Sequence, residues 1–338
     1  MVRPLWTPHV DRFCHQCLQL EPAPDYPPAE VLRLAEAQDA LYTRLFADRA
    51  SLSGTPERYR ARLLKELVAR IEAAIEDWDE HAVSDDLMSA LSLLLGTSLP
   101  PESASVRAKC IVTYHLSLLS PGDRWDEPGI RLREKRSLIS ACGTTGLRTW
   151  EAALHLGQYL CLHPDVVAGK RVLELGAGTG YLSILCAKYL SATHAVVSDG
   201  SDEVVDSLTG NFRLNVADSA RLSPRMLRWG RAQPRAQEGD QGQSPVDVVL
   251  GADITYDDRA MPALVETIVD LMGLSSGAEV YIAATQRNER TFATFLEVCG
   301  RNGLDVEDIT FPVTPREQQR GPFYENQVAI RICRLLRV

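Results

Sequence analysis

Residues 171–180 read RVLELGAGTG, an apolar run that is typical of a buried strand and is followed by three glycines. A helix is expected directly afterwards, over residues 181–190. A strand, a glycine-rich turn and a helix form the layout of a nucleotide-binding site, because glycine permits a tight turn and the helix N-terminus offers free N–H groups. The stretch therefore predicts an α/β fold with a ligand that contains a nucleoside or nucleotide.

The spacing of the glycines narrows the choice of ligand. They are Gly176, Gly178 and Gly180, a GxGxG pattern. A dinucleotide fingerprint requires its third glycine at position 181, where this chain has Tyr181. Glu174 precedes the first glycine by two residues, and Asp199 ends the next predicted strand, where its carboxylate could hold both hydroxyls of a ribose. The pattern argues against a nicotinamide dinucleotide.

The sequence around this loop alternates between short apolar runs and helical segments from residue 165 onward. Predicted strands cover 171–175, 195–198, 225–228, 246–251 and 278–284. Such alternation predicts a parallel, doubly wound sheet with its ligand beyond the carboxyl ends of the strands. Two further strands, 304–311 and 327–336, are expected to pair antiparallel, and the Gly- and Gln-rich residues 231–245 to form a surface insertion.

The N-terminal part has helical periodicity instead, and residues 28–119 are predicted to be helical throughout. One apolar stripe runs from Tyr59 to Trp78, a third helix lies between Ser84 and Gly96, and a fourth covers 106–118. Stripes of this kind are packing surfaces more often than cofactor sites. We therefore expect a helical domain over residues 1–120 that serves substrate recognition, and a catalytic domain over 121–338. Basic residues at period two predict a strand over 130–140.

Composition excludes several classes of protein. The 338 residues are 45% hydrophobic and 24% charged, which is ordinary for a globular chain of two domains. No run approaches the roughly 18 apolar residues of a membrane span, and the start has no signal-peptide pattern, so we expect a cytoplasmic protein. The net charge of -9 is spread evenly, unlike that of a nucleic-acid binder. The eight cysteines contain one CxxC, Cys14 and Cys17, without a second pair, so no metal site is predicted.

The glycine loop and the two acids resemble those of class I methyltransferases, with residues 174–180 as their first motif and Asp199 as the ribose-binding acid. Residues 143–153, 228–230 and 251–256 read GTTGLRTWEAA, RWG and GADITY, which is similar to the family 16 protein-lysine methyltransferases. Within that family, the long helical N-terminal segment is most similar to members that methylate eukaryotic elongation factor 2. The resemblance covers the catalytic half well and the N-terminal half in outline.

This resemblance implies a Rossmann-like sheet of seven strands, preceded by a helical domain, with S-adenosylmethionine as the cofactor. The cofactor-binding residues that it implies are Trp150, Glu174, Gly176, Gly178, Gly180, Asp199, Trp229 and Ala252. Asp253 would accept a hydrogen bond from the incoming amine, and Tyr256 would wall the lysine channel. From the residues alone, an Asp after a strand, such as Asp253, is more commonly a helix cap than a catalytic group, Trp229 is more often a core residue, and Trp150 could be core alone.

The function expected from the sequence is methyl transfer to a lysine of a translation elongation factor, with elongation factor 2 as the protein substrate. The enzyme is expected to be a monomer that binds neither nucleic acid nor membrane. Two alternatives are a methyltransferase that acts on another protein or a small molecule, and a binding module that keeps the cofactor fold without catalysis. The presence of both Asp253 and Tyr256 favours an enzyme.

Overall fold

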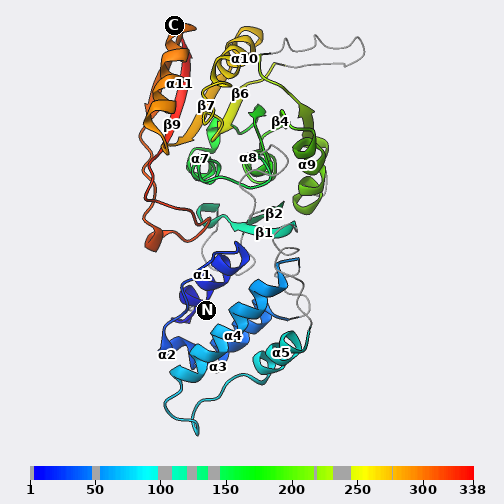
Figure 1. The fold of residues 1–338 in the computed structure, drawn as a ribbon, viewed down its shortest axis with the longest axis vertical. Helices are drawn as coiled ribbons and strands as arrows, with labels where there is room; N and C mark the ends of the chain where they lie inside the picture. The colour runs from blue at the N-terminus through cyan, green and yellow to red at the C-terminus, as the bar shows by residue number, and fades with distance from the viewer. Residues whose placement is uncertain are drawn as a thin grey trace. The chain divides into compact units, whose positions relative to one another are not determined.

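The computed structural model describes residues 4–47, 54–97, 109–119, 128–135, 145–216, 219–230, 245–275 and 277–338 (Figure 1). The chain forms two compact units, Met1–Ile139 with Gln319–Phe323, and Ser140–Gln318 with Tyr324–Val338. The predicted domain boundary at residue 120 lies outside the described residues. The contacts divide the chain after residue 139 instead, and they add a short C-terminal segment to the first unit.

The second unit contains a sheet of seven strands. They are β3 (Arg171–Leu175), β4 (His194–Asp199), β5 (Leu222–Met226), β6 (Val248–Ala252), β7 (Glu279–Thr285), β8 (Leu304–Ile309) and β9 (Ile330–Arg337), in the spatial order β5-β4-β3-β6-β7-β9-β8. The strands β3 to β7 are parallel to one another, and β9 runs antiparallel to both β7 and β8. The Rossmann-like α/β fold and the antiparallel final pair are confirmed.

One strand of this sheet was predicted at the wrong place. The predicted strand 225–228 is β5, which begins earlier, at Leu222, and ends at Met226. Pro224 made the start of this strand hard to recognise in the sequence, because proline has no N–H to donate to a neighbouring strand. It is tolerated here since β5 is the edge strand, with only β4 beside it.

In the described residues of this unit, five helices accompany the sheet: α7 (Glu151–Leu162), α8 (Tyr181–Lys188), α9 (Asp202–Asn215), α10 (Met261–Leu274) and α11 (Glu289–Arg301), with short 3-10 turns at Pro164–Val166, Ser219–Arg221 and Arg316–Gln318. Leu173 and Leu175 of β3 face the core that α10 and α11 cover. Glu174 lies between them and so points to the opposite face, where it bonds Ser183 of α8. The alternation along one strand therefore places a carboxylate under the glycine loop.

The first unit is helical at its N-terminal end. Its helices are α1 (Thr7–Leu18), α2 (Ala29–Leu32), α3 (Ala35–Leu45), α4 (Glu57–Ala74) and α5 (Asp85–Gly96), and they share one apolar core. A hairpin-like pair follows, β1 (Cys110–His115) and β2 (Gly129–Glu134), with a 3-10 turn at Ser117–Leu119. The pair is antiparallel, with Cys110 opposite Glu134 and His115 opposite Gly129.

The fourth predicted helix, over 106–118, is wrong. Its described part contains β1 instead, whose sequence CIVTYH is rich in β-branched and aromatic residues. The strand β2 lies in the region of the predicted basic strand and pairs with β1, with Cys110 opposite Glu134. This pairing explains why residues 110–115 form a strand. Helical periodicity was extended into a segment whose partner is not local.

The predicted apolar stripes of α4 and α5 are less buried than expected. The helix α4 stops at Ala74, Ile75 adopts an extended conformation, and Trp78 is 60% exposed. On α5 only Leu87 is buried, whereas Leu93 and Leu95 are 72% and 64% exposed. The stripes thus supply a narrower packing surface than their apolar residues imply.

A segment between β8 and β9 completes the first unit. Phe323 is 1% exposed, and its backbone N–H donates to the side chain of Gln19 at 2.8 Å. The same glutamine amide donates back to the Phe323 carbonyl. Arg12 donates to the carbonyl of Gln319, and its guanidinium carbon lies 5.2 Å from the centre of the Phe323 ring. The first and last parts of the chain therefore share one fold unit.

The described ranges contain neither a membrane-spanning helix nor a metal-binding cluster. No helix within them is long and apolar enough to span a bilayer. The same ranges contain no group of three His, Cys, Asp or Glu side chains arranged to hold a metal ion. Of the predicted insertion at 231–245, residues 231–244 lie outside the described part of the chain.

Candidate active site

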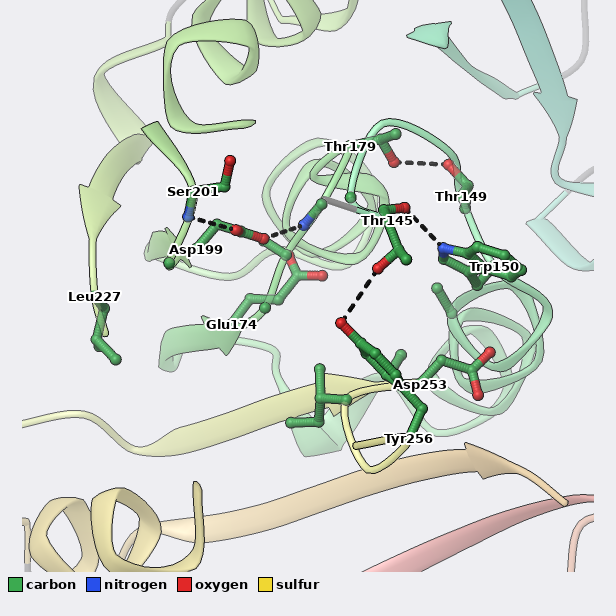
Figure 2. A pocket seen from close by; sticks show the side chains of 18 of the residues that line it. Thr145, Thr149, Trp150, Glu174, Thr179, Asp199, Ser201, Leu227, Asp253 and Tyr256 are labelled. Atoms are coloured by element: carbon green, nitrogen blue, oxygen red, sulfur yellow. Dashed lines mark hydrogen bonds between the residues drawn. The ribbon is translucent and has the colours of Figure 1, made fainter. Parts of the chain in front are cut away.

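A cavity of about 400 Å³ lies where β3, β4 and β6 end (Figure 2). Every predicted site residue except Gly180 lines it. Gly180 instead precedes α8, and a Cβ there would lie 3.0 Å from Leu208. The structure thus brings together in one place residues that are more than a hundred positions apart in the sequence.

The glycine loop is shaped by what touches it. Gly176 has φ +60°, a left-handed conformation, and a Cβ at this position would lie 2.6 Å from Ile254. Gly178 has φ +54°, and its Cβ would lie 3.1 Å from the Gly146 carbonyl oxygen. A side chain at either position would clash or strain the backbone, so the loop requires glycine, and the absence of side chains lets a ligand approach its backbone closely.

Asp199 stands at the end of β4 beside this loop. Its Oδ2 accepts from the N–H of Gly178 at 3.1 Å, and its Oδ1 accepts from the N–H of Ser201 at 3.0 Å. Burial raises the pKa of the Asp199 carboxyl, and these backbone donors partly offset the shift. Each oxygen has a second lone pair, so the carboxylate can accept two hydroxyl donors from a ligand while it holds the loop.

Glu174 lies beneath the loop and is 3% exposed. The N–H of Ser183 donates to its Oε2 at 3.0 Å, and the Ser183 hydroxyl donates to the same oxygen. Burial raises the pKa of this carboxyl to about 7, against the lowering by the Ser183 bonds. Glu174 is therefore near the midpoint of its titration at neutral pH and can become ionised when a cation binds beside it.

Some residues at the site were not anticipated from the sequence. The amide of Asn211 donates to the carbonyl of Thr179 at 2.9 Å and so ties α9 to the glycine loop. The hydroxyls of Thr149 and Thr179 lie 2.6 Å apart and join the loop to the segment before α7. Only the position of these residues in the fold reveals their roles, because Asn and Thr are common surface residues.

Two tryptophans border the cavity at different places. Trp229 follows β5 and also packs against the core under α10. Trp150 immediately precedes α7, and its indole N–H donates to the carbonyl of Thr145 at 3.0 Å. In Figure 2 Asp199 and Leu227 lie on one side, with Trp150 and Asp253 on the other. The cavity is thus elongated between β4 and the N-terminus of α7.

Asp253 follows β6 in a left-handed conformation, with φ +51°. Its Oδ1 accepts from the N–H of Thr285 at 2.8 Å, and its Oδ2 accepts from the Thr285 hydroxyl at 2.9 Å and from the N–H of Ala152 at 3.3 Å. The carboxylate therefore caps α7, which precedes it in sequence by a hundred residues, and not the helix that follows it. Burial is the main cause of its raised pKa.

Tyr256 lies at the mouth of the cavity and is 63% exposed. The Thr145 hydroxyl donates to its phenol oxygen at 3.3 Å. A second cavity of about 140 Å³ is bordered by Asp253 and Tyr256 as well, together with residues 284–288 after β7. These two side chains thus stand between the large cavity and a smaller one.

The large cavity fits S-adenosylmethionine. Gly176 and Gly178 keep side chains out of the lining, which suits close approach of the ligand to the backbone, and Asp199 can accept from both ribose hydroxyls. Glu174, Asp199 and Asp253 give the lining three carboxyls, which suits a ligand whose sulfonium and ammonium groups are cationic. An apolar ring near β5, Trp229, can lie against a purine.

Comparisons with known proteins agree with this geometry. The family described as lysine methyltransferase matches residues 126–301. Protein-lysine N-methyltransferase EFM3 of Chaetomium thermophilum is 51% identical over 332 residues, which cover 98% of both chains. The EFM3 protein of Saccharomyces cerevisiae is 29% identical over 83% of this chain and 84% of its own. Protein-lysine N-methyltransferase EEF2KMT of Homo sapiens is 30% identical over 82% of this chain and 79% of its own.

Among solved structures, a methyltransferase from Pyrococcus furiosus matches with a TM-score of 0.40 and 16% identity, over 54% of this chain and 83% of its own. The magnesium protoporphyrin IX methyltransferase of Synechocystis, with bound SAM, has a TM-score of 0.38 and 18% identity, over 54% and 76%. The sequence comparisons and the cavity together decide the assignment: the chain belongs to the lysine methyltransferase family and is an enzyme that depends on S-adenosylmethionine.

Proposed function

We propose that the chain methylates a lysine of elongation factor 2 in the cytoplasm. The observation that carries this proposal is the similarity to EEF2KMT of Homo sapiens over 82% of the chain, because the name of that relative refers to elongation factor 2. The 51% identity to an EFM3 protein along nearly the whole chain, N-terminal unit included, supports methylation of a protein lysine. Both relatives extend well beyond the catalytic family match, which supports a shared protein substrate and not only a shared reaction.

In the proposed assignment, the cofactor lies along the large cavity. Asp199 accepts from the ribose, the Gly176 and Gly178 backbone and Ala252 border the nucleoside, and Trp229 lies against the base. Gly180 acts indirectly, by letting the loop turn into α8. Trp150 borders the opposite, amino-acid end, and Glu174 lies beneath the glycine loop near Asp199.

The bound cofactor supplies a methyl group on a sulfonium, which passes to a neutral lysine amine as its C–S bond breaks and an N–C bond forms. The residues of the chain have to orient that amine and exclude water from it, since positioning supplies most of the acceleration in such a displacement. Asp253 is proposed to accept a hydrogen bond from the amine through the lone pair left on Oδ1, and Tyr256 to wall the channel through which the lysine side chain enters. Both border the two cavities, which supports this placement.

The N-terminal unit is proposed to recognise the folded substrate. Its interior is filled by its own packing, and a lysine side chain alone buries far less than the roughly 1,200 to 2,000 Å² of a specific protein interface. Recognition by a second unit supplies the missing area.

The direct experiment incubates the purified chain with S-adenosylmethionine that carries a labelled methyl group and with purified elongation factor 2, followed by peptide mass spectrometry. Elongation factor 1A serves as the matched protein control. We expect label on one lysine of elongation factor 2 and none on the control. Label on a different protein in a cell extract, with elongation factor 2 unlabelled, would refute the substrate assignment and leave the methyltransferase assignment intact.

A further inference from the structure

A cluster of charged side chains surrounds Trp150 without belonging to the predicted site. Glu151, the first residue of α7, accepts from Arg148 at 3.0 Å through one carboxylate oxygen and from Arg287 through the other. Both guanidinium carbons lie over the Trp150 ring, at 4.9 Å and 5.1 Å from its centre. One carboxylate thus holds two cations against one aromatic ring of the cavity wall.

The cluster joins the first residue of α7, Glu151, to the segment before that helix and to the loop after β7. Arg148 and Trp150 come from the segment before α7, whereas Arg287 comes from the loop after β7. Arg287 also lies 3.8 Å from Asp253, which itself accepts from the N–H of Ala152 in the first turn of α7. The side chain of Glu151 is only 17% exposed, so solvent screens its ion pairs less than it screens those of a fully exposed acid.

We infer that Glu151 is a positioning residue for the amino-acid end of the cofactor. It fixes Arg148 and Arg287 against Trp150, and the ring in turn forms a rigid wall at the end of the cavity opposite Asp199. Cation–π contacts of this geometry are attractive, so two of them on one ring restrict its orientation. This inference rests on the cofactor placement proposed above but not on the identity of the protein substrate.

Stabilisation of α7 by an acid at its N-terminus is the simpler role from which the positioning role of Glu151 has to be distinguished. An acid in the first turn of a helix stabilises the helix through its dipole whether or not a ring lies nearby. Asp202 offers a control for that role, because it is the first residue of α9 and pairs with Arg228 at 3.3 Å, while the described residues place no aromatic ring over this pair. A dipole effect alone predicts a change in stability for Glu151→Gln and Asp202→Asn, and no ligand-selective loss of affinity for either.

The test measures binding of two ligands by calorimetry. S-adenosylmethionine occupies the whole cavity, whereas 5′-methylthioadenosine has the nucleoside but lacks the amino-acid part. We expect Glu151→Gln to weaken S-adenosylmethionine about tenfold, equivalent to about 1.4 kcal/mol, and to leave methylthioadenosine within about twofold. Asp202→Asn should leave both affinities within about twofold. Equal loss for both ligands, or no loss for either, would overturn the inference.

Two further measurements keep the test decisive if Glu151→Gln is unstable. Arg287→Lys retains the charge but loses the planar guanidinium, so it should show the same ligand selectivity with a smaller loss. Hydrogen exchange at the first turn of α7 should be faster in Glu151→Gln than in Asp202→Asn. Unchanged exchange and unchanged selectivity in Arg287→Lys would contradict the positioning role. None of these readouts uses a protein substrate, so they remain informative if elongation factor 2 proves not to be methylated.

Discussion

The two units of the chain hold their buried polar side chains in different ways. In the first unit, amides are tied to the backbone: Gln38, fully buried, donates to the carbonyls of Leu32 and Ala82 and accepts from the N–H of Ser84, and Gln19 binds both backbone groups of Phe323. Buried carboxyls of this unit pair with other side chains, Asp11 with Arg44 and Glu134 with the Tyr114 hydroxyl. In the second unit, carboxyls whose pKa burial raises are gathered around one cavity.

The difference reflects two tasks. A buried amide satisfies both a donor and an acceptor and does not change charge with pH, so it can join loops to a rigid frame. A buried carboxyl with a raised pKa is costly to ionise until a cation arrives. The first unit is thus built to hold its shape, and the second to respond to a charged ligand.

The largest expected effect separates the units. Phe323→Ala should destabilise the first unit by about 3 to 5 kcal/mol, because it empties a buried site in which the ring is 1% exposed. Cofactor affinity should stay within about twofold, since the ring belongs to the first unit. Denaturant unfolding and calorimetry of the same variant provide the two readouts. Leu5→Ala, at a position 94% exposed, is the control. Loss of cofactor binding in a folded Phe323→Ala variant would break the comparison.

The next effect concerns the carboxyl that is proposed to meet the substrate. Asp253→Ala should lower methyl transfer by at least about a hundredfold, because misplacement of the reacting groups alone costs that much. Its cofactor affinity should change by no more than about threefold, although the variant leaves the N–H of Thr285 unpaired and should unfold at a lower temperature. Asp257→Asn, on the exposed part of the same loop, is the control. If a folded Asp253→Ala variant methylates at the rate of the unmodified enzyme, Asp253 acts only as a cap of α7.

Asp199→Ala should weaken S-adenosylmethionine by about ten- to a hundredfold, since hydrogen bonds to a charged group contribute about 1.5 to 3 kcal/mol. The same loss is expected for 5′-methylthioadenosine, because the ribose is common to both ligands. Calorimetry with each ligand provides the measurement. A variant that loses S-adenosylmethionine but keeps methylthioadenosine would place the ribose elsewhere in the cavity.

The pH dependence of cofactor affinity tests the role of the Glu174 carboxyl in the second unit. With its pKa raised to about 7, the carboxyl must lose a proton before it can pair with the cationic end of the cofactor. Affinity should therefore rise with pH and fall by up to about tenfold for each unit below about pH 6.5. Glu174→Gln should bind more weakly at high pH and show a flatter profile. Calorimetry from about pH 5.5 to pH 8.5 tests this, and a parental affinity that falls as pH rises would contradict it.

The smallest expected effect concerns the first unit. Trp78→Ala should change the free energy of unfolding by less than about 0.5 kcal/mol, because the side chain is 60% exposed beyond the end of α4. Leu67→Ala, on the same apolar stripe but fully buried, should cost about 2 to 5 kcal/mol. Chemical denaturation compares the two. A similar cost for both would show that Trp78 packs against the unit after all.

The catalytic unit was largely predictable because its signals are local. The strand before Gly176, the glycines themselves and the acids at strand ends lie within short segments, and parallel pairing then brings the strand ends together. The partners of Asp253 were not predictable, since Ala152 and Thr285 are far from it in sequence and offer only backbone groups and a hydroxyl.

The first unit was predicted less well, for a related reason. Helical periodicity identified α4 and α5, but β1 depends on β2 for its pairing, so the β-branched and aromatic residues of CIVTYH indicate a strand only together with that partner. The role of Phe323 was equally hidden, because its partners Gln19 and Arg12 lie at the opposite end of the chain. Long-range polar contacts leave no periodic trace in a sequence.

The contribution of residues 319–323 to the first unit also bears on how the protein is made. A ribosome releases the N-terminal helices first, and domains generally fold as they emerge. Here the site that Phe323 fills lacks its ring until residue 323 has been synthesised. Gln19, which binds the Phe323 backbone, precedes it by 304 residues. The unit that is synthesised first therefore cannot complete its packing until a distant part of the chain has followed.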